Sequence, residues 1–379
     1  MSSNSKKEII AITRKRYKSA PKWKKGRILD EFCATLGFNR KYAIYVLNHT
    51  RVHRKRPGRP KLYSQETIKH LRRLWILMGQ MCSKNMKAAL PIWLVHYECE
   101  ELVKKEILSM SHATIDRRLK PYRASTRRKL NSGTVFSKRH LKHIIPIKPF
   151  DYNVSAPGSV EVDTVAHCGG FMAGEFVWSL SLTDRYSGWT EVRAMLGKSA
   201  LKTLDRLKDI ERSLPFEITK INSDNGTEFL NRHLIAYFGP EKMTRSRAYR
   251  KNDNCYIEQK NFTHVRELFF YDRIDGPHTP KLMNDIYQNE HSLLQNFFVP
   301  QTKFEYKVRV GSRYKRKYSP PKTPYQRLLE CPDISEEVKR ALKVQFHNLD
   351  PFKLRKEREK KLRFFFKGLK PSTEREVAS

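Results

Sequence analysis

The chain has 379 residues, in which 76 Lys and Arg residues oppose 39 Asp and Glu residues, so its formal net charge is +37 at pH 7. Such an excess predicts a polyanionic partner, and nucleic acid is the first candidate. A hydrophobic content of 39% is enough for globular cores, and the length predicts two to four domains. Because no apolar stretch is long enough to span a membrane and the start lacks the apolar region of a signal peptide, we expect an intracellular protein. The six cysteines contain no CxxC pair and are predicted to be reduced thiols.

Residues 1–50 carry a helix-turn-helix pattern. An apolar helix ends at a Leu36-Gly37-Phe38 turn, and the next helix begins at Asn39 with Arg40 and Lys41 on its outer side. We place this second helix in a DNA major groove; a helical hairpin without DNA contact is the alternative. Its inward positions are predicted to be Ala43, Val46 and Leu47.

Two further basic segments follow before the composition changes. Residues 51–62 form a linker whose Pro-Gly-Arg-Pro centre, with Arg59, is similar to an AT-hook; an ordinary basic linker is the alternative. Residues 63–121 predict a second helix-turn-helix-like DNA-binding domain, in which Ser111 caps a helix that presents Arg117 to DNA. Residues 122–156 are basic and interrupted by proline, as expected of a linker.

From residue 157 to about residue 294 the hydrophobic pattern becomes that of an α/β domain. Three strand-like runs come first, then a helix, and then strand and helix alternate. This order fits an RNase H-like mixed sheet that begins with a meander. The predicted strands are 159–166, 176–184, 189–193, 218–223 and 242–245, and a helix is predicted over 228–238.

Three acidic residues are expected to meet on this sheet. Asp163 lies inside the first strand, Asp224 ends the fourth at an Asn225-Gly226 turn, and Glu258 lies early in a helix predicted over 254–270. Carboxylates that share a pocket repel by roughly 4 kcal/mol per pair at about 4 Å and an effective dielectric constant near 20. Such a cluster therefore predicts bound divalent cations, and two-metal sites suit in-line attack on phosphodiesters.

Several neighbouring residues are predicted to support this site without acting in it. His167 and Cys168 are interpreted as a packing pair at the end of the first strand. The acidic residues with predicted supporting roles are Glu161, Asp184 and Glu228.

The last part of the chain is basic throughout. Residues 295–330 predict a small β module, with a strand over 304–310. Residues 331–379 predict a helical basic tail, in which Asp333 caps one helix and another begins at Pro351. This last helix is either solvated or in contact with a DNA backbone.

Together these motifs resemble a DDE-type insertion-sequence transposase with a retroviral-integrase-like catalytic core. The resemblance covers roughly residues 20–330 and is strongest from 157 to 276. The motifs that carry it are Val160-Glu-Val-Asp-Thr-Val-Ala-His-Cys-Gly169, Ser223-Asp-Asn-Gly-Thr-Glu-Phe229 and Asn254-Cys-Tyr-Ile-Glu-Gln-Lys-Asn261.

The resemblance implies a DNA transposase in the bacterial cytoplasm, associated with the nucleoid. Asp163, Asp224 and Glu258 would hold two Mg²⁺ ions, or Mn²⁺ in their place, hydrolyse the DNA at the element ends and join the 3′ ends to target DNA by transesterification. The partners would be double-stranded element ends and target DNA, bound by a homodimer or a higher oligomer.

One position departs from the pattern of this family. Many relatives have Lys or Arg seven residues after the acidic residue of the helix, where this chain has Val265. Lys260 or Arg266 is then expected to make the phosphate contact. An RNase H-like nuclease without strand transfer and a degenerate, DNA-binding regulator are the alternative functions.

Overall fold

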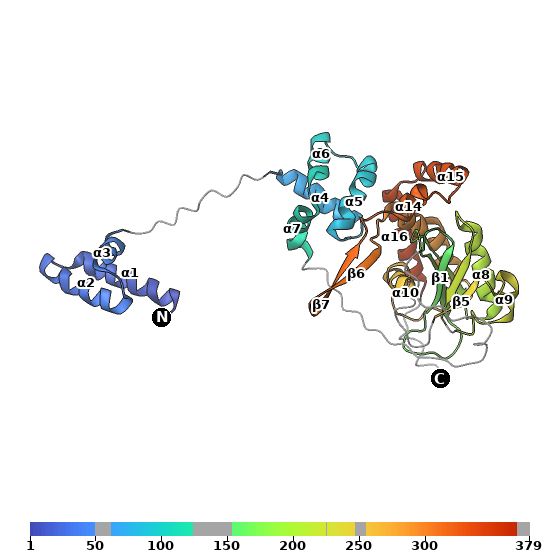
Figure 1. The fold of residues 1–379 in the computed structure, drawn as a ribbon, viewed down its shortest axis with the longest axis horizontal. Coiled ribbons are helices and arrows are strands. Elements are labelled where there is room, and N and C mark those ends of the chain that lie inside the picture. Colours follow the sequence, from blue (N-terminus) through green and yellow to red (C-terminus); the bar gives the residue numbers. More distant parts are fainter. Residues whose placement is uncertain (50–61, 124–153, 225, 247–254, 370–379) are drawn as a thin grey trace. The chain divides into compact units, whose positions relative to one another are not determined.

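The computed structural model describes residues 1–49, 62–123, 154–224, 226–246 and 255–369, except for the side chains of Ser3, Cys255, Tyr256 and Glu258. The chain divides into two compact units, Met1–Leu62 and Tyr63–Ser379 (Figure 1). Arg59 and most of the predicted linker 122–156 lie outside the described residues.

The first unit is a three-helix structure. Gly37 ends the second helix in the left-handed region (φ 66°), which glycine adopts without strain, and its N–H bonds to the Cys33 carbonyl. The Asn39 side chain caps the third helix by accepting the Tyr42 N–H at 2.8 Å. The predicted helix-turn-helix pattern of secondary structure is thereby confirmed. The helices are α1 (Ser3–Ser19), α2 (Lys22–Leu36) and α3 (Arg40–Asn48).

The second unit contains a five-stranded mixed sheet of order β3-β2-β1-β4-β5. β1, β2 and β3 form an antiparallel meander, while β4 and β5 run parallel to β1. The central strand is therefore β1, as predicted. The strands are β1 (Ser159–Ala166), β2 (Val177–Asp184), β3 (Thr190–Leu196), β4 (Lys220–Ser223) and β5 (Met243–Arg245).

Helices cover both faces of this sheet, which makes the unit a mixed α/β structure. Val160 and Val162 of β1 pack with α8 and α9 on one face. Val165 of β1 packs on the other face, against the segments that follow α10 (Figure 1). The helical segments around the sheet are α8 (Ala200–Ser213), α9 (Arg232–Phe238), α10 (Cys255–Lys260), the π-helical η3 (Asn261–Arg266), α11 (Glu267–Phe269), α12 (Thr279–Ile286), the π-helical η4 (Tyr287–His291) and α13 (Ser292–Phe298).

The helices before the sheet share one hydrophobic core with helices after it. Trp93 is 1% exposed, and its indole N–H donates to the Phe298 carbonyl at 2.9 Å. Its ring also meets that of Phe352 edge-on, with 5.1 Å between centroids. The segments in this core are α4 (Gln65–Leu77), α5 (Ser83–Trp93), η1 (Leu94–His96), α6 (Glu101–Ser109), α7 (His112–Arg123), α14 (Pro324–Glu330), α15 (Glu336–His347) and α16 (Pro351–Gly368).

Two predicted details of the elements need correction. Ser335, not Asp333, caps α15, because its side chain accepts the Val338 N–H at 3.3 Å. The predicted helix 228–238 begins only at Arg232. The basic helix α16 also packs inward, since Phe365 is buried in the core beneath the sheet.

The remaining strands form a separate hairpin, β6 (Phe304–Val310) paired with β7 (Arg313–Tyr318). Among the residues that the structure describes, no helix has both the length and the apolar content needed to cross a membrane.

Trp93→Ala is expected to destabilise the protein by about 3–5 kcal/mol, because it removes a buried indole and leaves a cavity. In chemical denaturation, the unfolding transition of the α4–α7 region and that of the sheet should coincide, since Trp93 joins both parts. Val95→Ala is the control, because Val95 is 77% exposed and its loss should change stability by less than about 0.5 kcal/mol. Separate transitions for the two parts would contradict a shared core.

Candidate active site

Two of the three predicted acidic residues come together at one edge of the sheet. Asp163 lies on β1, and Asp224 directly follows the parallel neighbour β4. Both side chains are partly buried. The two carboxylates are close enough that the charge of Asp224 raises the pKa of Asp163.

The environment opposes ionisation of both carboxyl groups. Burial, and then the negative charge of Asp224, raises the pKa of Asp163 to about 7. Burial also raises the pKa of Asp224, and the charge of Glu228 raises it further, while the Gly226 N–H and Lys198 lower it. Such a pair is stabilised by any cation that enters between the carboxylates, and hard divalent cations prefer oxygen ligands.

Glu258 lies on a helix that packs over β1 and is hydrogen-bonded to Asp163. Asn261 donates from Nδ2 to the Asp163 Oδ2 at 2.7 Å and accepts the Ser181 hydroxyl at 2.5 Å. Near the other end of α10, the Ile257 N–H donates to the buried Glu161 carboxylate at 3.1 Å. Position 258 therefore lies between two bonds to β1, as expected of a helix that packs across the sheet, and its side chain is outside the described residues.

The backbone hydrogen-bond pattern of this helix changes where α10 ends. α10 passes into the π-helical segment Asn261–Arg266 at the residue that bonds to Asp163. π-Helical turns are rare and occur frequently at functional sites. Asn261 was not predicted to act in the site, although it lies one turn after Glu258 and ends one of the motifs that carry the family resemblance.

Glu228 and Lys198 also belong to this site. The Glu228 carboxylate is buried, accepts the Thr164 hydroxyl at 3.1 Å and pairs with the Lys198 ammonium at 2.8 Å. Lys198 also lies over the Trp178 ring, 4.2 Å from its centroid. Glu228 is thus bonded to the strand that carries Asp163, in agreement with a supporting role, whereas Lys198 was not predicted.

The other supporting residues have structural partners. Asp184 accepts the Gly158 N–H at 3.0 Å and the Ser187 N–H at 2.7 Å. His167 is buried and bonds through Nε2 to the Ser179 hydroxyl at 2.8 Å, and burial lowers its pKa to about 3. It is therefore a neutral packing residue, as interpreted.

The two candidates for the phosphate contact differ in accessibility. Lys260 is buried, donates to Gln301 Oε1 at 2.5 Å, and has its pKa lowered to about 7 by burial. A phosphate contact by Lys260 would require its buried ammonium group to become accessible. Arg266 is half-buried, donates to the Phe270 carbonyl at 3.2 Å and stacks over the Tyr271 ring.

The remaining predicted DNA-binding residues lie on helix surfaces. Arg40 and Lys41 are exposed on the first turn of α3, where Arg40 forms an ion pair with Asp30. Arg117 is exposed on α7, the helix after Ser111, whose hydroxyl accepts the Thr114 N–H at 3.2 Å.

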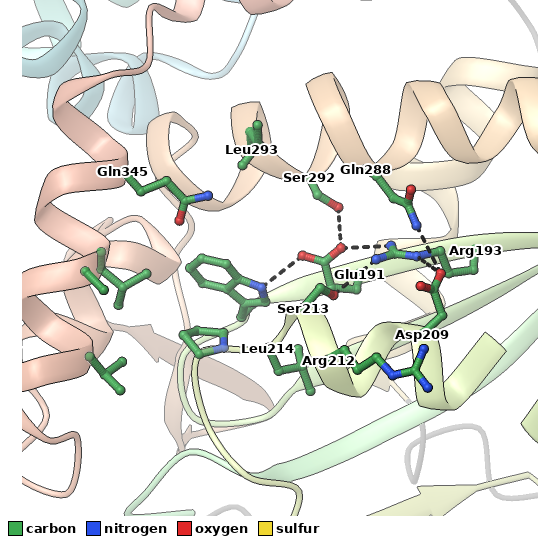
Figure 2. Close-up of a pocket in the computed structure, with 15 residues that line it drawn as sticks. Glu191, Arg193, Asp209, Arg212, Ser213, Leu214, Gln288, Ser292, Leu293 and Gln345 are labelled. Atoms are coloured by element: carbon green, nitrogen blue, oxygen red, sulfur yellow. Dashed lines mark hydrogen bonds and ion pairs between the residues drawn. The ribbon is translucent and has the colours of Figure 1, made fainter. Parts of the chain in front are cut away.

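A pocket of about 530 Å³ lies away from the acidic residues, where β3 meets α8, α13 and α15 (Figure 2). Its buried Glu191 accepts the Trp189 indole N–H at 3.1 Å, the Ser292 hydroxyl at 2.8 Å and an Arg193 N–H at 3.0 Å. The same Arg193 donates to Asp209 at 2.8 Å. These charges are satisfied by one another, so the network stabilises the sheet edge and leaves the acidic site as the better candidate.

Comparison with known proteins identifies a relative. No model of a known protein family matches the chain. It is 33% identical over 340 residues to the uncharacterized protein y4rM of Sinorhizobium fredii (strain NBRC 101917 / NGR234), a match that covers 86% of this chain and 96% of the relative. The chain belongs to the y4rM family. The match is longer than the unit Tyr63–Ser379 and so extends into the first unit.

No group of three or more His, Cys, Asp or Glu side chains stands ready to bind one metal ion among the side chains that the structure describes, which do not include that of Glu258. Whether the site suits a metal ion is therefore judged from its two described carboxylates. Asp163 and Asp224 supply oxygen ligands, and burial raises both pKa values, so the pair favours a bound proton or a cation over two uncompensated charges.

Divalent-cation binding is expected to depend on pH through Asp163. Because burial and Asp224 raise its pKa to about 7, a cation must displace a proton from Asp163 at lower pH. The apparent Mg²⁺ association constant should rise by about tenfold per pH unit from about pH 5 to 7, and then level off. Calorimetric titration at several pH values measures this. Asp163→Asn should abolish the pH dependence, whereas Asp205→Asn, on the exposed side of α8, should leave it unchanged. A Mg²⁺ affinity of the parent protein that does not change with pH would contradict the assignment of Asp163 as a ligand.

Removal of the Asn261 amide should move this pH dependence upward. The Asn261 bond to Asp163 favours the charged carboxylate, so Asn261→Ala is expected to raise the pKa of Asp163. The midpoint of the Mg²⁺ titrations should shift by about one pH unit to higher pH. Asn289→Ala is a matched control, because Asn289 is exposed and bonds only to Asp285 among its described side-chain partners. A shift of the midpoint to lower pH would contradict the inference that the Asn261 amide favours the charged form of Asp163.

Proposed function

We propose that this protein is a DDE-type DNA transposase, a polynucleotidyl transferase that cuts element ends and joins them to target DNA. The observation that carries the proposal is the placement of Asp163 on β1 beside Asp224, which directly follows the parallel strand β4, with Asp163 bonded to Asn261 one turn after Glu258. Three acidic residues from these elements are the metal ligands in the family that the sequence resembles.

The order of the strands supports an RNase H-like core. Such a core was expected to begin with a three-stranded meander and to place Asp163 on the central strand. The sheet has this meander, and Asp224 follows the strand beside β1. The proposal therefore rests on where the strands place the acidic residues as well as on their sequence motifs.

Asp163, Asp224 and Glu258 would hold divalent ions, which supply charge stabilisation to the attacking and leaving oxygens of a phosphodiester. The protein's own residues prepare this site. Asn261 orients Asp163 through its amide, and Lys198 holds Glu228 beside the pair. The partial burial of both aspartates lowers the local dielectric constant, which strengthens their attraction for cations.

DNA would be held by surfaces outside the acidic site. The net charge of +37 favours a polyanion, and α3 presents Arg40 and Lys41 at its first turn. The ion pair of Arg40 with Asp30 is exposed, so it contributes little stability and can be exchanged for a phosphate. We further propose that element ends are paired by a dimer or higher oligomer on bacterial DNA in the cytoplasm.

Asp224→Asn is expected to reduce metal-dependent DNA cleavage by at least about 100-fold while DNA affinity stays within about twofold, because it removes a metal ligand and no DNA-binding surface. The substrate is a duplex that contains the end of the encoding element, and the assay measures cleaved and joined products with Mg²⁺, with Mn²⁺ and with a chelator.

Asp205→Asn is the matched control, since it removes the same charge from an exposed position of α8. Undiminished cleavage by Asp224→Asn would refute the site. Cleavage without joined products would favour a nuclease, and metal-independent DNA binding without any cleavage would favour a DNA-binding regulator.

A further inference from the structure

The β6–β7 hairpin exposes both of its faces. Every residue from Glu305 to Tyr318 is exposed, including Tyr306 at 53%, Val308 at 49% and Val310 at 49%. An isolated two-stranded hairpin is only marginally stable in water. An apolar row on such a hairpin indicates a surface that is covered by a partner.

The charge of the hairpin defines this partner. Over residues 304–318 the only acidic residue is Glu305. The strand register places cations beside the apolar row, with Val308 opposite Lys315 and Val310 opposite Arg313. The opposite face is basic as well, with Lys307 paired to Arg316. The basic residues of the hairpin are Lys307, Arg309, Arg313, Lys315, Arg316 and Lys317.

The base of the hairpin is attached both to the sheet and to α10. Lys303 donates to the Tyr186 carbonyl at 2.5 Å, in the turn between β2 and β3. Gln301 accepts the Lys260 ammonium at 2.5 Å through its side chain and an Arg327 guanidinium N–H through its carbonyl. Since Lys260 ends α10, the hairpin is held by the same helix that carries Glu258.

We propose that the β6–β7 hairpin is an arm that binds duplex DNA beside the acidic site. A two-stranded β-ribbon fits the width of the major groove, and cations on both of its faces can neutralise the phosphates that border it. The apolar row would contact base edges such as thymine methyl groups. This inference rests on the proposed function in taking DNA as the substrate, but it concerns binding and not the metal-dependent step.

The test measures DNA affinity of the full chain as a function of salt. Arg313→Thr, Lys315→Thr and Lys317→Thr, combined in one variant, keep β-forming residues while they remove three cations. Affinity for a 40-base-pair duplex at 0.15 M salt should fall by about tenfold or more, and the slope of log K against log salt by about 2 to 3, since each phosphate contact contributes about 0.9.

The control variant removes three exposed cations from α15 and α16, Arg340→Ala, Lys343→Ala and Lys353→Ala. It has the same net charge as the hairpin variant, so an equal loss of affinity and slope in both would overturn the proposal. A changed oligomeric state of the hairpin variant without DNA, with unchanged DNA affinity, would likewise overturn it and point to a second copy of the chain as the partner.

A second variant leaves all charges in place. Ser312→Cys, in the exposed turn between the strands, allows attachment of a photo-crosslinker. Crosslinking to duplex DNA above the level of the parent protein is expected, and its absence would overturn the proposal. Because neither assay requires cleavage, the hairpin can fail while Asp224→Asn still abolishes activity, and the acidic site can fail while the hairpin still binds DNA.

Discussion

The hydrogen bond from the Asn261 amide to the Asp163 carboxylate is the contact on which the arrangement of the candidate site depends. It joins the end of α10 to the central strand, and the bond of the Ile257 N–H to Glu161 joins the beginning of α10 to the same strand. Hydrogen bonds to charged groups contribute about 1.5–3 kcal/mol each. Two such bonds determine where position 258 lies above the sheet, although neither involves its side chain.

The sheet was predictable because its signals are local. Alternating apolar residues mark β1 over 159–166, and the Asp-Asn-Gly turn marks the end of β4. Since neighbouring parallel strands end at the same edge of a sheet, the proximity of Asp163 and Asp224 followed from these two signals and the expected strand order. The helix start at Asn39 and the cap at Ser111 were equally local, and both are present.

The remaining features depend on partners that are distant in sequence. Nothing near Lys260 indicates that Gln301 will bury it, and nothing near Glu228 indicates its pair with Lys198. The burial of Phe365 was missed for a similar reason, because the high charge of α16 hides its single apolar face. These long-range contacts separate side chains that are buried around the acidic pair from side chains that remain exposed.

The packing of α16 also has a consequence for biosynthesis. Phe365 packs in the same buried hydrophobic layer as Val265 and Phe269. In the chain, these two residues come just after the helical residue that bonds to Asp163. During translation this layer stays open until residue 365 has left the ribosome. The first unit, with its own separate core, is complete long before that moment. A nascent chain can therefore present its folded N-terminal helices while the layer behind its acidic residues is still unfinished.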